Sequence, residues 1–596
     1  MDSSFLENNK KYLYMGVIGS GFFFVMMPIA CYLLVYVNPD FYIEKLYINS
    51  SSKLGIYEHA AISTDSELCT QIGKDILMKN GSAIETAIAT LICMGVVSSQ
   101  CVGLGGGFFM IIYDNKRNEV TVLDAKEIAP LKATKFMFIN NSIDSEIGGL
   151  AIAVPGELEG YEQAYIKTEK NIPWKDLFQP SIYLCRKGFP VTKHMAKALD
   201  LNRDIILKEE SMKIFINKAT GDVFKEGEIM TRLDLANTLE KIAVNGAAEL
   251  YKKGKTRENF VKDIQNLGGI ITEEDLDRYY VIRKQPTKIT LKNNFTVFGV
   301  PAPGSGHVVS FMLNVLDVFD LNKYSNWNTL DEVTLTFHRI IETFKFAYNY
   351  RRKLGDKETF KETITEKKLL NRNFAKLIRT KIKDDRTMQD VNYYSGDYGM
   401  VDVDGGTGHV SVVSPNGDAV SVTSSINLYF GCKRVSPSTG IVLNNHMHDF
   451  STPDVTNFFG FPSSESNRIK PGRRPMSSMS PTIILDDKGK LWLIIGGSGG
   501  SRIPSSIALV AMQLLWLDKN VKEAIDMPRV HHQLFPDYIS YENNFPEVIL
   551  RKLEKLGHKT KEKEGSLSVI EAIHRDKSGM WHSNADFRKN GKSDGI

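Results

Sequence analysis

A threonine that follows two glycines at the start of an alternating strand is the residue of this chain best suited to nucleophilic chemistry. The segment from Gly405 to Val413 has the sequence GGTGHVSVV, with the threonine at position 407. A turn signal from Ser414 to Asp418 separates it from a second alternating run, Ala419 to Ser424. Two such runs joined by a turn of this composition are typical of a β-hairpin. We therefore expect Thr407 to begin the first strand of a hairpin.

Cleavage between Gly406 and Thr407 would give Thr407 a free α-amine beside its own hydroxyl. That amine can act as general base for the hydroxyl, which turns an ordinary threonine into a nucleophile. Glycine has no Cβ, so Gly406 leaves room for the hydroxyl to attack the preceding carbonyl. The alternative interpretation of the segment is a plain hairpin edge with a glycine-rich approach.

Seven further blocks, in a fixed order along the chain, accompany the segment around Thr407. They are Asn80–Ala89 (NGSAIETAIA), Gly103–Phe108 (GLGGGF), Ala153–Glu157 (AVPGE), Ser425–Gly431 (SINLYFG), Asn444–Phe450 (NNHMHDF), Pro475–Met479 (PMSSM) and Gly499–Gly500. Together these blocks resemble the γ-glutamyltransferase (glutathione hydrolase) family, its animal membrane-bound members most closely. The resemblance extends from about Lys53 to the C-terminus.

The resemblance implies a mixed α/β (α+β) fold, a four-layer αββα sandwich of the N-terminal nucleophile hydrolase type. It also implies self-cleavage into a large chain, residues 53–406, and a small chain, residues 407–596, which remain together as a heterodimer around one core. Local patterns agree with mixed α/β structure. Residues 84–96 are apolar nearly all round, as in a buried helix, residues 331–350 have helical spacing, and residues 108–113 and 119–123 alternate as strands do.

The chemistry that the resemblance implies is acyl transfer. Thr407 would attack the γ-glutamyl carbonyl of glutathione, and water or an acceptor amino acid or dipeptide would then take the γ-glutamyl group. The tetrahedral oxyanion needs backbone N–H donors, which Gly499 and Gly500 could supply ahead of a helix-like run at 505–517. Ser425 stands where the family often has a second threonine. We expect its hydroxyl to keep a hydrogen bond to Thr407.

The resemblance also implies which residues bind the amino acid end of the substrate. The hydroxyls of Ser477 and Ser478 would bind its α-carboxylate, and the side-chain oxygens of Asn427 and Asp449 would bind its α-ammonium. Taken alone, the serine pair would be interpreted as a loop and Asp449 as a surface acid.

Two positions depart from the family pattern. Lys126 stands where the family commonly has an arginine, and a lysine keeps the charge but loses the two-pronged grip on a carboxylate. His446 stands where animal members commonly place an acid that holds the ammonium. The alternative function is therefore a catalytically weakened or inactive member that acts as a surface binding or regulatory protein.

A metal site at His446, His448 and Asp449 is the competing interpretation of that block, because two imidazoles two residues apart on a strand would face one side. No other His/Cys pair of matching spacing completes it, so we expect no metal and no cofactor. The glycine loops at 103–107 and 499–500 lack the Lys-Ser/Thr ending of a P-loop. We expect His409 to be a strand residue beside the nucleophile, and His531–His532 to pack at a helix end.

The N-terminus is membrane-seeking. An uncharged run from Tyr12 to Val37 is long enough to span a bilayer as a helix, and Lys10 and Lys11 precede it. The positive-inside rule places residues 1–11 in the cytosol. We predict a signal-anchor at 12–37, a stalk at 38–52, and a single-pass type II protein of the plasma membrane with its catalytic part outside. The alternative is a cleaved signal peptide, but the run is too long and lacks a small-x-small cleavage site.

Composition fits an extracellular enzyme. The chain has 596 residues and a net charge of +4, too slight for a nucleic-acid binder. Of its six cysteines, Cys69 and Cys93 flank a predicted helical segment, 71–89, and the family pattern implies that they pair. The sequence assigns no partner to Cys101, Cys185 or Cys432. Among the sequons, we expect N-glycosylation at Asn49, Asn140 and Asn294, and none at Asn80.

Overall fold

The structure is a computed structural model that describes residues 46, 48 and 50–596, apart from 253, 359–363, 395–405 and 454–463. The predicted cytosolic tail, signal-anchor helix and most of the stalk, together with Asn49 and Gly405, lie outside the described residues. Within the described part, no helix has the length and apolar character needed to cross a bilayer.

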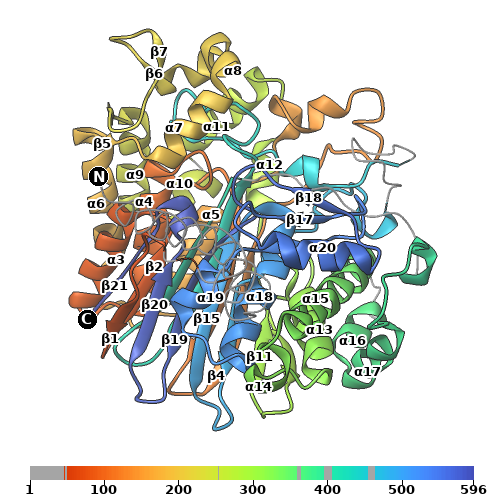
Figure 1. The fold of residues 1–596 in the computed structure, drawn as a ribbon. Coiled ribbons are helices and arrows are strands. Elements are labelled where there is room, and N and C mark those ends of the chain that lie inside the picture. Colours follow the sequence, from red (N-terminus) through yellow and green to blue (C-terminus); the bar gives the residue numbers. More distant parts are fainter. Residues whose placement is uncertain are drawn as a thin grey trace, which may run out of the picture.

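Two seven-stranded antiparallel sheets form the centre of the molecule (Figure 1). The first sheet has the order β21 (Lys592–Gly595), β2 (Ala61–Thr64), β12 (Gly406–Val413), β13 (Ala419–Asn427), β3 (Gly107–Asp114), β4 (Glu119–Ala125), β9 (Ile282–Lys284). The second has the order β1 (Gly55–Tyr57), β20 (Trp581–Ala585), β19 (Val569–Arg575), β15 (Leu491–Ser498), β14 (Thr482–Leu485), β11 (Thr296–Gly299), β10 (Thr287–Thr290).

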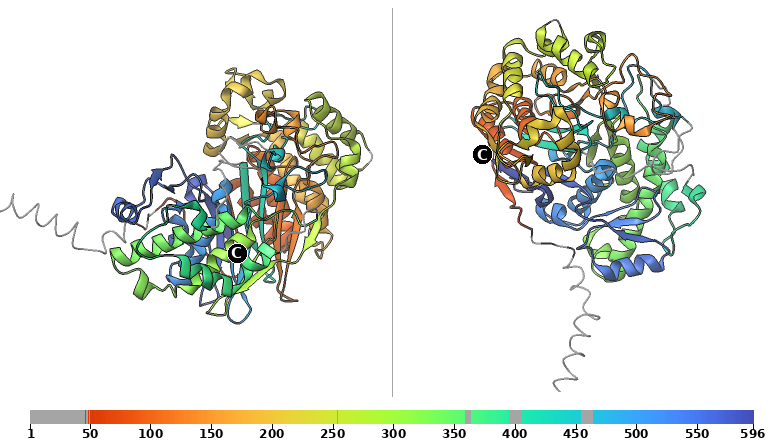
Figure 2. Two further views of the ribbon diagram at one scale, coloured as in Figure 1. Left: turned by 90° about the vertical axis from the view of Figure 1, so that its right-hand side faces the viewer. Right: turned by 90° about the horizontal axis from the view of Figure 1, so that it is seen from above.

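The sheets pack face to face, and helices cover both outer faces (Figure 1, Figure 2). The first sheet is covered by α3 (Glu67–Met78), α4 (Ala83–Val97) and α5 (Glu157–Tyr165), and the second by α13 (Gly306–Val318), α18 (Ile503–Trp516) and α19 (Val521–Asp526). One apolar core fills the space between each sheet and its helices, and a third lies between the sheets. This is the αββα layering expected above.

Further helices extend the two outer layers. On the side of the first sheet they include α6 (Trp174–Lys187), α7 (Lys193–Leu201), α9 (Leu233–Asn245), α11 (Lys255–Asn266) and α12 (Glu273–Arg278), and on the side of the second α15 (Leu330–Arg351), α16 (Ile364–Leu370), α17 (Arg372–Lys381) and α20 (Glu547–Lys555). The bounds of α4, α15, β3 and β4 confirm the local predictions.

The β12–β13 hairpin lies at the middle of the first sheet, and both of its faces are buried, since α4 covers one and the second sheet covers the other. Alternation sends Val410 and Val412 into the core under α4, whereas His409 and Ser411 point toward the second sheet. Strands that precede Thr407 in the sequence flank this hairpin on both sides. The segments before and after Thr407 therefore share one core.

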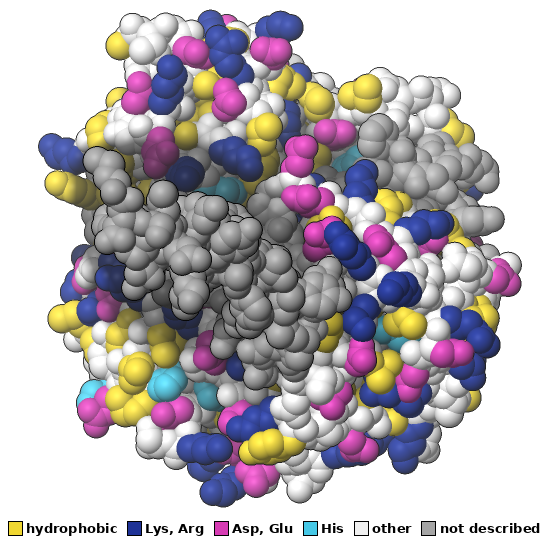
Figure 3. Space-filling model, viewed as in Figure 1, with side chains coloured by type: hydrophobic (Ala, Val, Ile, Leu, Met, Phe, Trp, Pro, Cys, Tyr) yellow, Lys and Arg dark blue, Asp and Glu magenta, His cyan; other side chains and the backbone are white. Residues whose placement is uncertain are grey.

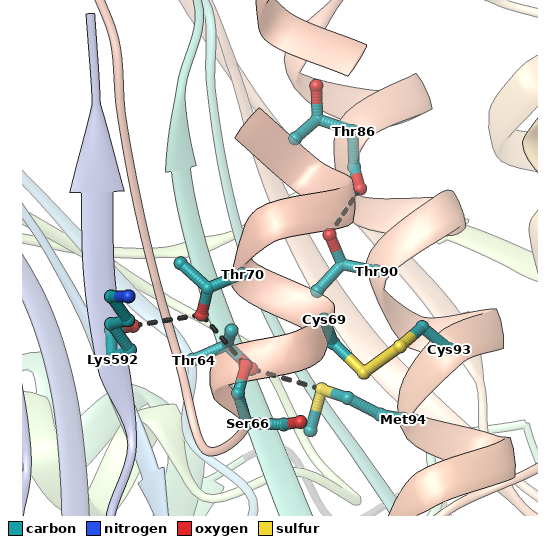
Figure 4. Close-up of a disulfide and its surroundings, with 9 residues drawn as sticks. All are labelled: Thr64, Ser66, Cys69, Thr70, Thr86, Thr90, Cys93, Met94 and Lys592. Carbon is teal, nitrogen blue, oxygen red and sulfur yellow. Dashed lines mark hydrogen bonds between the residues drawn. A yellow bond between two sulfur atoms is a disulfide. The ribbon is translucent and has the colours of Figure 1, made fainter. Parts of the chain in front are cut away.

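A disulfide joins α3 to α4 on the outside of the first sheet (Figure 4). It pairs Cys69 with Cys93, as the resemblance implied. The segment between them is two helices rather than one, because Ser82 caps a new helix and accepts a hydrogen bond from the N–H of Glu85. Cys101, Cys185 and Cys432 are buried free thiols.

Two histidine expectations can also be judged. His409 lies on β12, as predicted. His531 belongs to a short strand, β16 (Val530–His531), that pairs with β17 (Ile539–Tyr541). It packs at helix ends as predicted, because its Nδ1 lies 2.8 Å from the hydroxyl of Ser505 in the first turn of α18 and its ring contacts Tyr348 near the end of α15. On the face drawn in Figure 3, positive and negative side chains are interspersed rather than gathered into a basic stripe.

Candidate active site

Thr407 lies at an irregularity in the sheet. It pairs with Ser425 whereas Gly406 pairs with Asn427, so the register shifts between Gly406 and Thr407. Ile426 is the extra residue without a cross-strand partner on β12, and the neighbouring Asn427 has a φ of 78°. Thr407 is only 5% exposed. The bulge aims the Thr407 hydroxyl at Ser425, and the two oxygens are 3.1 Å apart.

The Ser425 hydroxyl connects the side chain of Thr407 to the peptide bond that precedes it. Ser425 Oγ donates a hydrogen bond of 2.8 Å to the carbonyl oxygen of Gly406 and accepts one of 2.9 Å from the N–H of Asn427. A serine hydroxyl has one proton, and the Gly406 carbonyl takes it. The Thr407 hydroxyl must therefore donate to Ser425, which confirms the predicted hydrogen bond and polarises the oxygen of Thr407.

A buried ion pair contacts the backbone of Thr407 from the C-terminal end of the chain. Lys589 Nζ donates to the Thr407 carbonyl oxygen over 2.7 Å and pairs with Asp65. Burial opposes the charge on Lys589, but the Asp65 carboxylate outweighs it and raises the Lys589 pKa. Burial also raises the pKa of the neighbouring Cys101 thiol to about 11, and this thiol faces the Thr407 N–H. Sequence reasoning missed all three residues, which lie far apart in the sequence.

Four charged or titratable side chains meet at the carboxyl end of β4. Lys126 Nζ lies 3.0 Å from Glu127 Oε2 and 3.8 Å from Asp449 Oδ2. His446 Nδ1 lies 2.9 Å from Glu127 Oε1. His446 Nε2 is 4.0 Å from Asp449 Oδ2. Lys126 and Glu127 are fully buried, whereas the Asp449 side chain is 22% exposed. Sequence reasoning brought three of these residues together and missed Glu127.

Charge governs the ionisation of this cluster. Burial opposes the charged form of Glu127, but His446 and Lys126 outweigh it and hold the Glu127 pKa below its usual value. The contacts are ion pairs by distance, and the buried polar atoms of Lys126, Glu127 and the Nδ1 of His446 have no well-aligned hydrogen bond among the described residues. Glu127 could have been suspected from its place in the polar run that ends an apolar strand.

The cluster is tied to the hairpin at two points. Gly107 is the cross-strand partner of Ser425, and a Cβ on Gly107 would come within 3.1 Å of the Glu127 carboxyl. Asn445 accepts a hydrogen bond from Asn427 Nδ2 at its carbonyl oxygen, and from Leu428 N at its side chain. The loop that carries His446 and Asp449 is therefore hydrogen-bonded to the end of β13, next to the partner of Thr407.

Ser477 and Ser478 are linked by hydrogen bonds to a second buried cation, Arg351. Ser478 Oγ accepts a hydrogen bond of 2.9 Å from Arg351 Nη2, and Arg351 Nε donates to Ser305. Ser305 Oγ in turn donates to the carbonyl oxygen of Ser477. Burial lowers the Arg351 pKa to about 10, and Asp449 opposes that shift. Arg351 comes from the last turn of α15, where it begins a run of three basic residues and is itself buried.

The remaining predicted residues are placed as follows. Gly499 and Gly500 follow β15 with φ values of 125° and 60°, which only glycine adopts readily, and Gly496 of the same strand packs on the His409 ring. No hydrogen bond joins the Gly499–Gly500 turn to Thr407 among the described residues. Its role as oxyanion donor stays a prediction. Asn140 and Asn294 are exposed, as is Asn80.

The structure does not support the strand on which the metal interpretation of His446, His448 and Asp449 depends. Residues 446–449 form a 3-10 turn rather than a strand, so His446 and His448 do not share a strand face. His448 Nδ1 lies 2.9 Å from the Ser145 hydroxyl, whereas His446 faces Glu127. In the described residues no group of three or more His, Cys, Asp or Glu side chains is placed to hold a metal ion.

Comparison with known proteins decides the family. The family model described as gamma-glutamyltranspeptidase matches residues 69–596. The chain belongs to the γ-glutamyltranspeptidase family. Among relatives of this family member, Scoloptoxin SSD14 of Scolopendra dehaani is 44% identical over 92% of this chain and 94% of its own length. Glutathione hydrolase proenzyme 1 of Schizosaccharomyces pombe is 35% identical over 94% and 89%.

A solved structure shares the fold of this γ-glutamyltranspeptidase. Cephalosporin acylase from Bacillus halodurans superposes with a TM-score of 0.80 at 23% identity, covering 92% of this chain and 98% of that one. At this level of identity the superposition shows that the two proteins share a fold.

Proposed function

We propose that this chain is a self-cleaving γ-glutamyl hydrolase and transferase of extracellular glutathione, of the N-terminal nucleophile hydrolase type, which works through a γ-glutamyl ester on Thr407. The observation that carries the proposal is the arrangement at the Gly406–Thr407 bond. Ser425 donates to the carbonyl that would be attacked and accepts from the hydroxyl that would attack it. The S. pombe relative is named a glutathione hydrolase proenzyme. We take glutathione as the substrate and processing of a precursor from that name.

Self-cleavage would proceed in two balanced steps. Thr407 Oγ1 loses its proton and bonds to the Gly406 carbonyl carbon, the C–N bond breaks, and the departing nitrogen keeps its hydrogen and takes up the proton that the hydroxyl lost to become an α-amine. Water then hydrolyses the ester, which leaves a carboxylate on Gly406 and restores the Thr407 hydroxyl. The new amine is the general base for each later turnover.

The cluster beyond the nucleophile is suited to the amino acid end of a γ-glutamyl group. Lys126 carries a positive charge for an α-carboxylate, and Asp449 and Glu127 carry negative charges for an α-ammonium. The hydrogen-bonding capacity left unused at Lys126 and Glu127 could be filled by such a zwitterion. Arg351 would add a second cation through Ser478. Gly499 and Gly500 would stabilise the oxyanion.

One observation favours the weakened alternative. Lys126 stands in place of the family's arginine, and its ammonium already lies near both Glu127 and Asp449. A substrate carboxylate must compete with these acids for a single point charge. A member with poor turnover could then persist as a surface binding or regulatory protein.

The experiment is a denaturing gel of the purified full-length protein, followed by release of p-nitroaniline from γ-glutamyl-p-nitroanilide. We expect two bands, the smaller starting at Thr407 by N-terminal sequencing, and activity that Thr407→Ala abolishes. Two bands without activity would favour the binding protein. A single uncut band would refute the catalytic proposal.

The N-terminal run at 12–37 supports a further part of this proposal, a type II anchor in the plasma membrane with glycans at Asn49, Asn140 and Asn294. A variant in which a cleavable leader replaces residues 1–37 should be secreted into the medium instead of remaining in the membrane fraction. Retention of the shortened protein in the membrane fraction would contradict the anchor.

A further inference from the structure

A small cavity lies in the outer helical layer of the first sheet, between α4, α9 and the glycine-rich loop before β3. Its walls are mostly apolar side chains, among them Leu91, Val96 and Leu239, and the backbone at Gly103 and Gly440 closes it. The space admits only a few non-hydrogen atoms. None of the residues assigned to the active site lines it.

Arg232 is the single charged residue among those that line the cavity. It is 3% exposed, and its Nη2 donates a hydrogen bond of 2.6 Å to the carbonyl oxygen of Gly440. Its Nη1 is buried without a hydrogen-bond partner, and no carboxylate of the described residues lies within ion-pair distance. The face of Phe215, 5.5 Å from the guanidinium carbon, gives partial compensation.

The surroundings of Arg232 increase the positive potential. Arg232 is the N-cap residue of α9, where the helix dipole is positive. The nearest acid in the sequence, Asp234, is exposed on the first turn of the helix. Burial lowers the Arg232 pKa to about 10, and the electrostatic effects of Cys185 and Asp234 offset this shift only in part. Buried charges are normally paired, since desolvation alone costs several kcal/mol per ion.

We propose that the Arg232 cavity binds a small monovalent anion, which accepts a hydrogen bond from Arg232 Nη1. A short-chain carboxylate is the class that fits best, because its head matches a guanidinium and its alkyl part matches the apolar walls. A halide ion would satisfy the same charge and leave the apolar space unfilled.

Occupancy would join two segments that lead to the active site. The segments 102–104 and 440–442 both line the cavity. Just after it their backbones touch, since a Cβ on Gly105 would lie 2.0 Å from the Val442 carbonyl oxygen. Asn444 then donates to the Gly105 carbonyl oxygen over 2.7 Å. An anion between Arg232 and this pair of segments should slow amide exchange in 103–107 and 441–445.

The test is thermal unfolding of the full-length protein at constant ionic strength, with sodium gluconate replaced stepwise by sodium butyrate or by sodium chloride. Gluconate is too large for the cavity. We expect butyrate to raise Tm by about 1 °C for each tenfold increase above its Kd, because a ligand that binds only the folded state stabilises it. Uncharged butyramide should have no effect.

Variants separate this site from general salt effects. Arg232→Gln should lose the butyrate response, and Leu239→Phe, which fills the cavity and keeps the guanidinium, should lose it too. Arg257→Gln is the matched control, because Arg257 is equally buried but pairs with Asp277 at 2.8 Å, and it should keep the response. A chloride response equal to butyrate, lost in Arg232→Gln, would identify a halide as the source of the same anion chemistry.

Amide exchange and crystallography give readouts besides stability. Butyrate should slow exchange at 103–107 and 441–445 in the wild type and leave it unchanged in Arg232→Gln. A crystal grown in bromide should show an anomalous peak beside Nη1. Identical anion responses in the wild type, Arg232→Gln and Leu239→Phe would overturn the proposal.

Discussion

Lys589 Nζ donates a hydrogen bond of 2.7 Å to the carbonyl oxygen of Thr407, so a residue near the C-terminus holds the backbone of the proposed nucleophile. The ammonium is buried and also pairs with Asp65, which is more than 500 residues away in the sequence. Three segments far apart in the sequence thus meet at one peptide unit. The position of the Thr407 hydroxyl depends on this contact as well as on its own strand.

Replacing Lys589 by methionine should strongly destabilise the fold, because Asp65 would be left as an uncompensated buried charge. Breaking a buried pair from one side costs about 3–5 kcal/mol. Urea unfolding measures the loss, and a gel shows whether two-chain formation slows with it. Lys592→Met is the control, since the exposed pair of Lys592 with Glu67 should contribute less than about 1 kcal/mol. Equal losses in the two variants would contradict the buried-pair account.

Removing the Ser425 hydroxyl should slow self-cleavage. Ser425→Ala loses the bonds to Gly406 and Thr407, and at about 0.5–1.5 kcal/mol for each the rate of two-chain formation should fall about 10-fold. Ser425→Thr keeps a hydroxyl and should cleave at nearly the wild-type rate. Ser424→Ala is the neighbouring control, because its hydroxyl contacts Glu157 instead. An unchanged rate in Ser425→Ala would remove Ser425 from the mechanism.

Lys126→Arg should improve capture of the γ-glutamyl donor. A planar guanidinium can bind a carboxylate with two hydrogen bonds, and one additional charged hydrogen bond is worth about 1.5–3 kcal/mol. The Michaelis constant for γ-glutamyl-p-nitroanilide should fall by about 10-fold or more, with a smaller change in kcat. Lys284→Arg is the control, since Lys284 pairs with Asp124. A Michaelis constant that does not fall would show that Lys126 does not contact the substrate.

Glu157 should make stability depend on pH. Burial raises the Glu157 pKa to about 8, and hydrogen bonds from Tyr161 and Ser424 only partly offset this. A carboxyl with a raised folded pKa contributes its full stability below its unfolded pKa and loses it as pH rises through the folded value. The window is therefore about pH 4.5 to 8, with a loss of about 1.4 kcal/mol for each pH unit.

The measurement is urea unfolding at pH 5, 7 and 9 of the wild type and Glu157→Gln, which keeps a similar shape and cannot ionise. The free energy of unfolding of Glu157→Gln relative to the wild type should rise from pH 5 to pH 8 and then level off. Parallel pH profiles for the two proteins would show that Glu157 is ionised in the folded state.

The Cys69–Cys93 disulfide should stabilise the outer helical layer. It closes a loop with a sequence separation of 24, and chain-entropy reasoning gives about 3.5 kcal/mol for a loop of that size. The double variant Cys69→Ser/Cys93→Ser should therefore unfold at lower urea concentration. Cys101→Ser is the control for loss of a buried sulfur. Stability equal to that of the wild type would show that the disulfide does not constrain the unfolded chain.

Much of the fold could be predicted from local pattern. The alternation around Thr407 predicts a hairpin, and the apolar run at 84–96 predicts a buried helix, because burial of one or both faces imposes a period on the sequence. No such pattern exists at His446–Asp449, where the competing metal interpretation assumed a strand and the chain forms a 3-10 turn. Short polar segments carry no such period, and their contacts with the rest of the chain decide their shape.

The sequence by itself determined which residues have the chemistry, Thr407 after a glycine and the blocks that contain Ser425, Lys126, Asp449 and the serine pair. Only the tertiary structure brought Lys589 to the Thr407 carbonyl, Glu127 to His446, and Arg351 to Ser478. The physical reason is that the chemical type of a side chain can be read at a single position. Ion pairs in a buried site instead join side chains from distant segments, which come together only when the two sheets pack. The separation of two residues in the sequence does not predict whether they will be in contact in the folded protein.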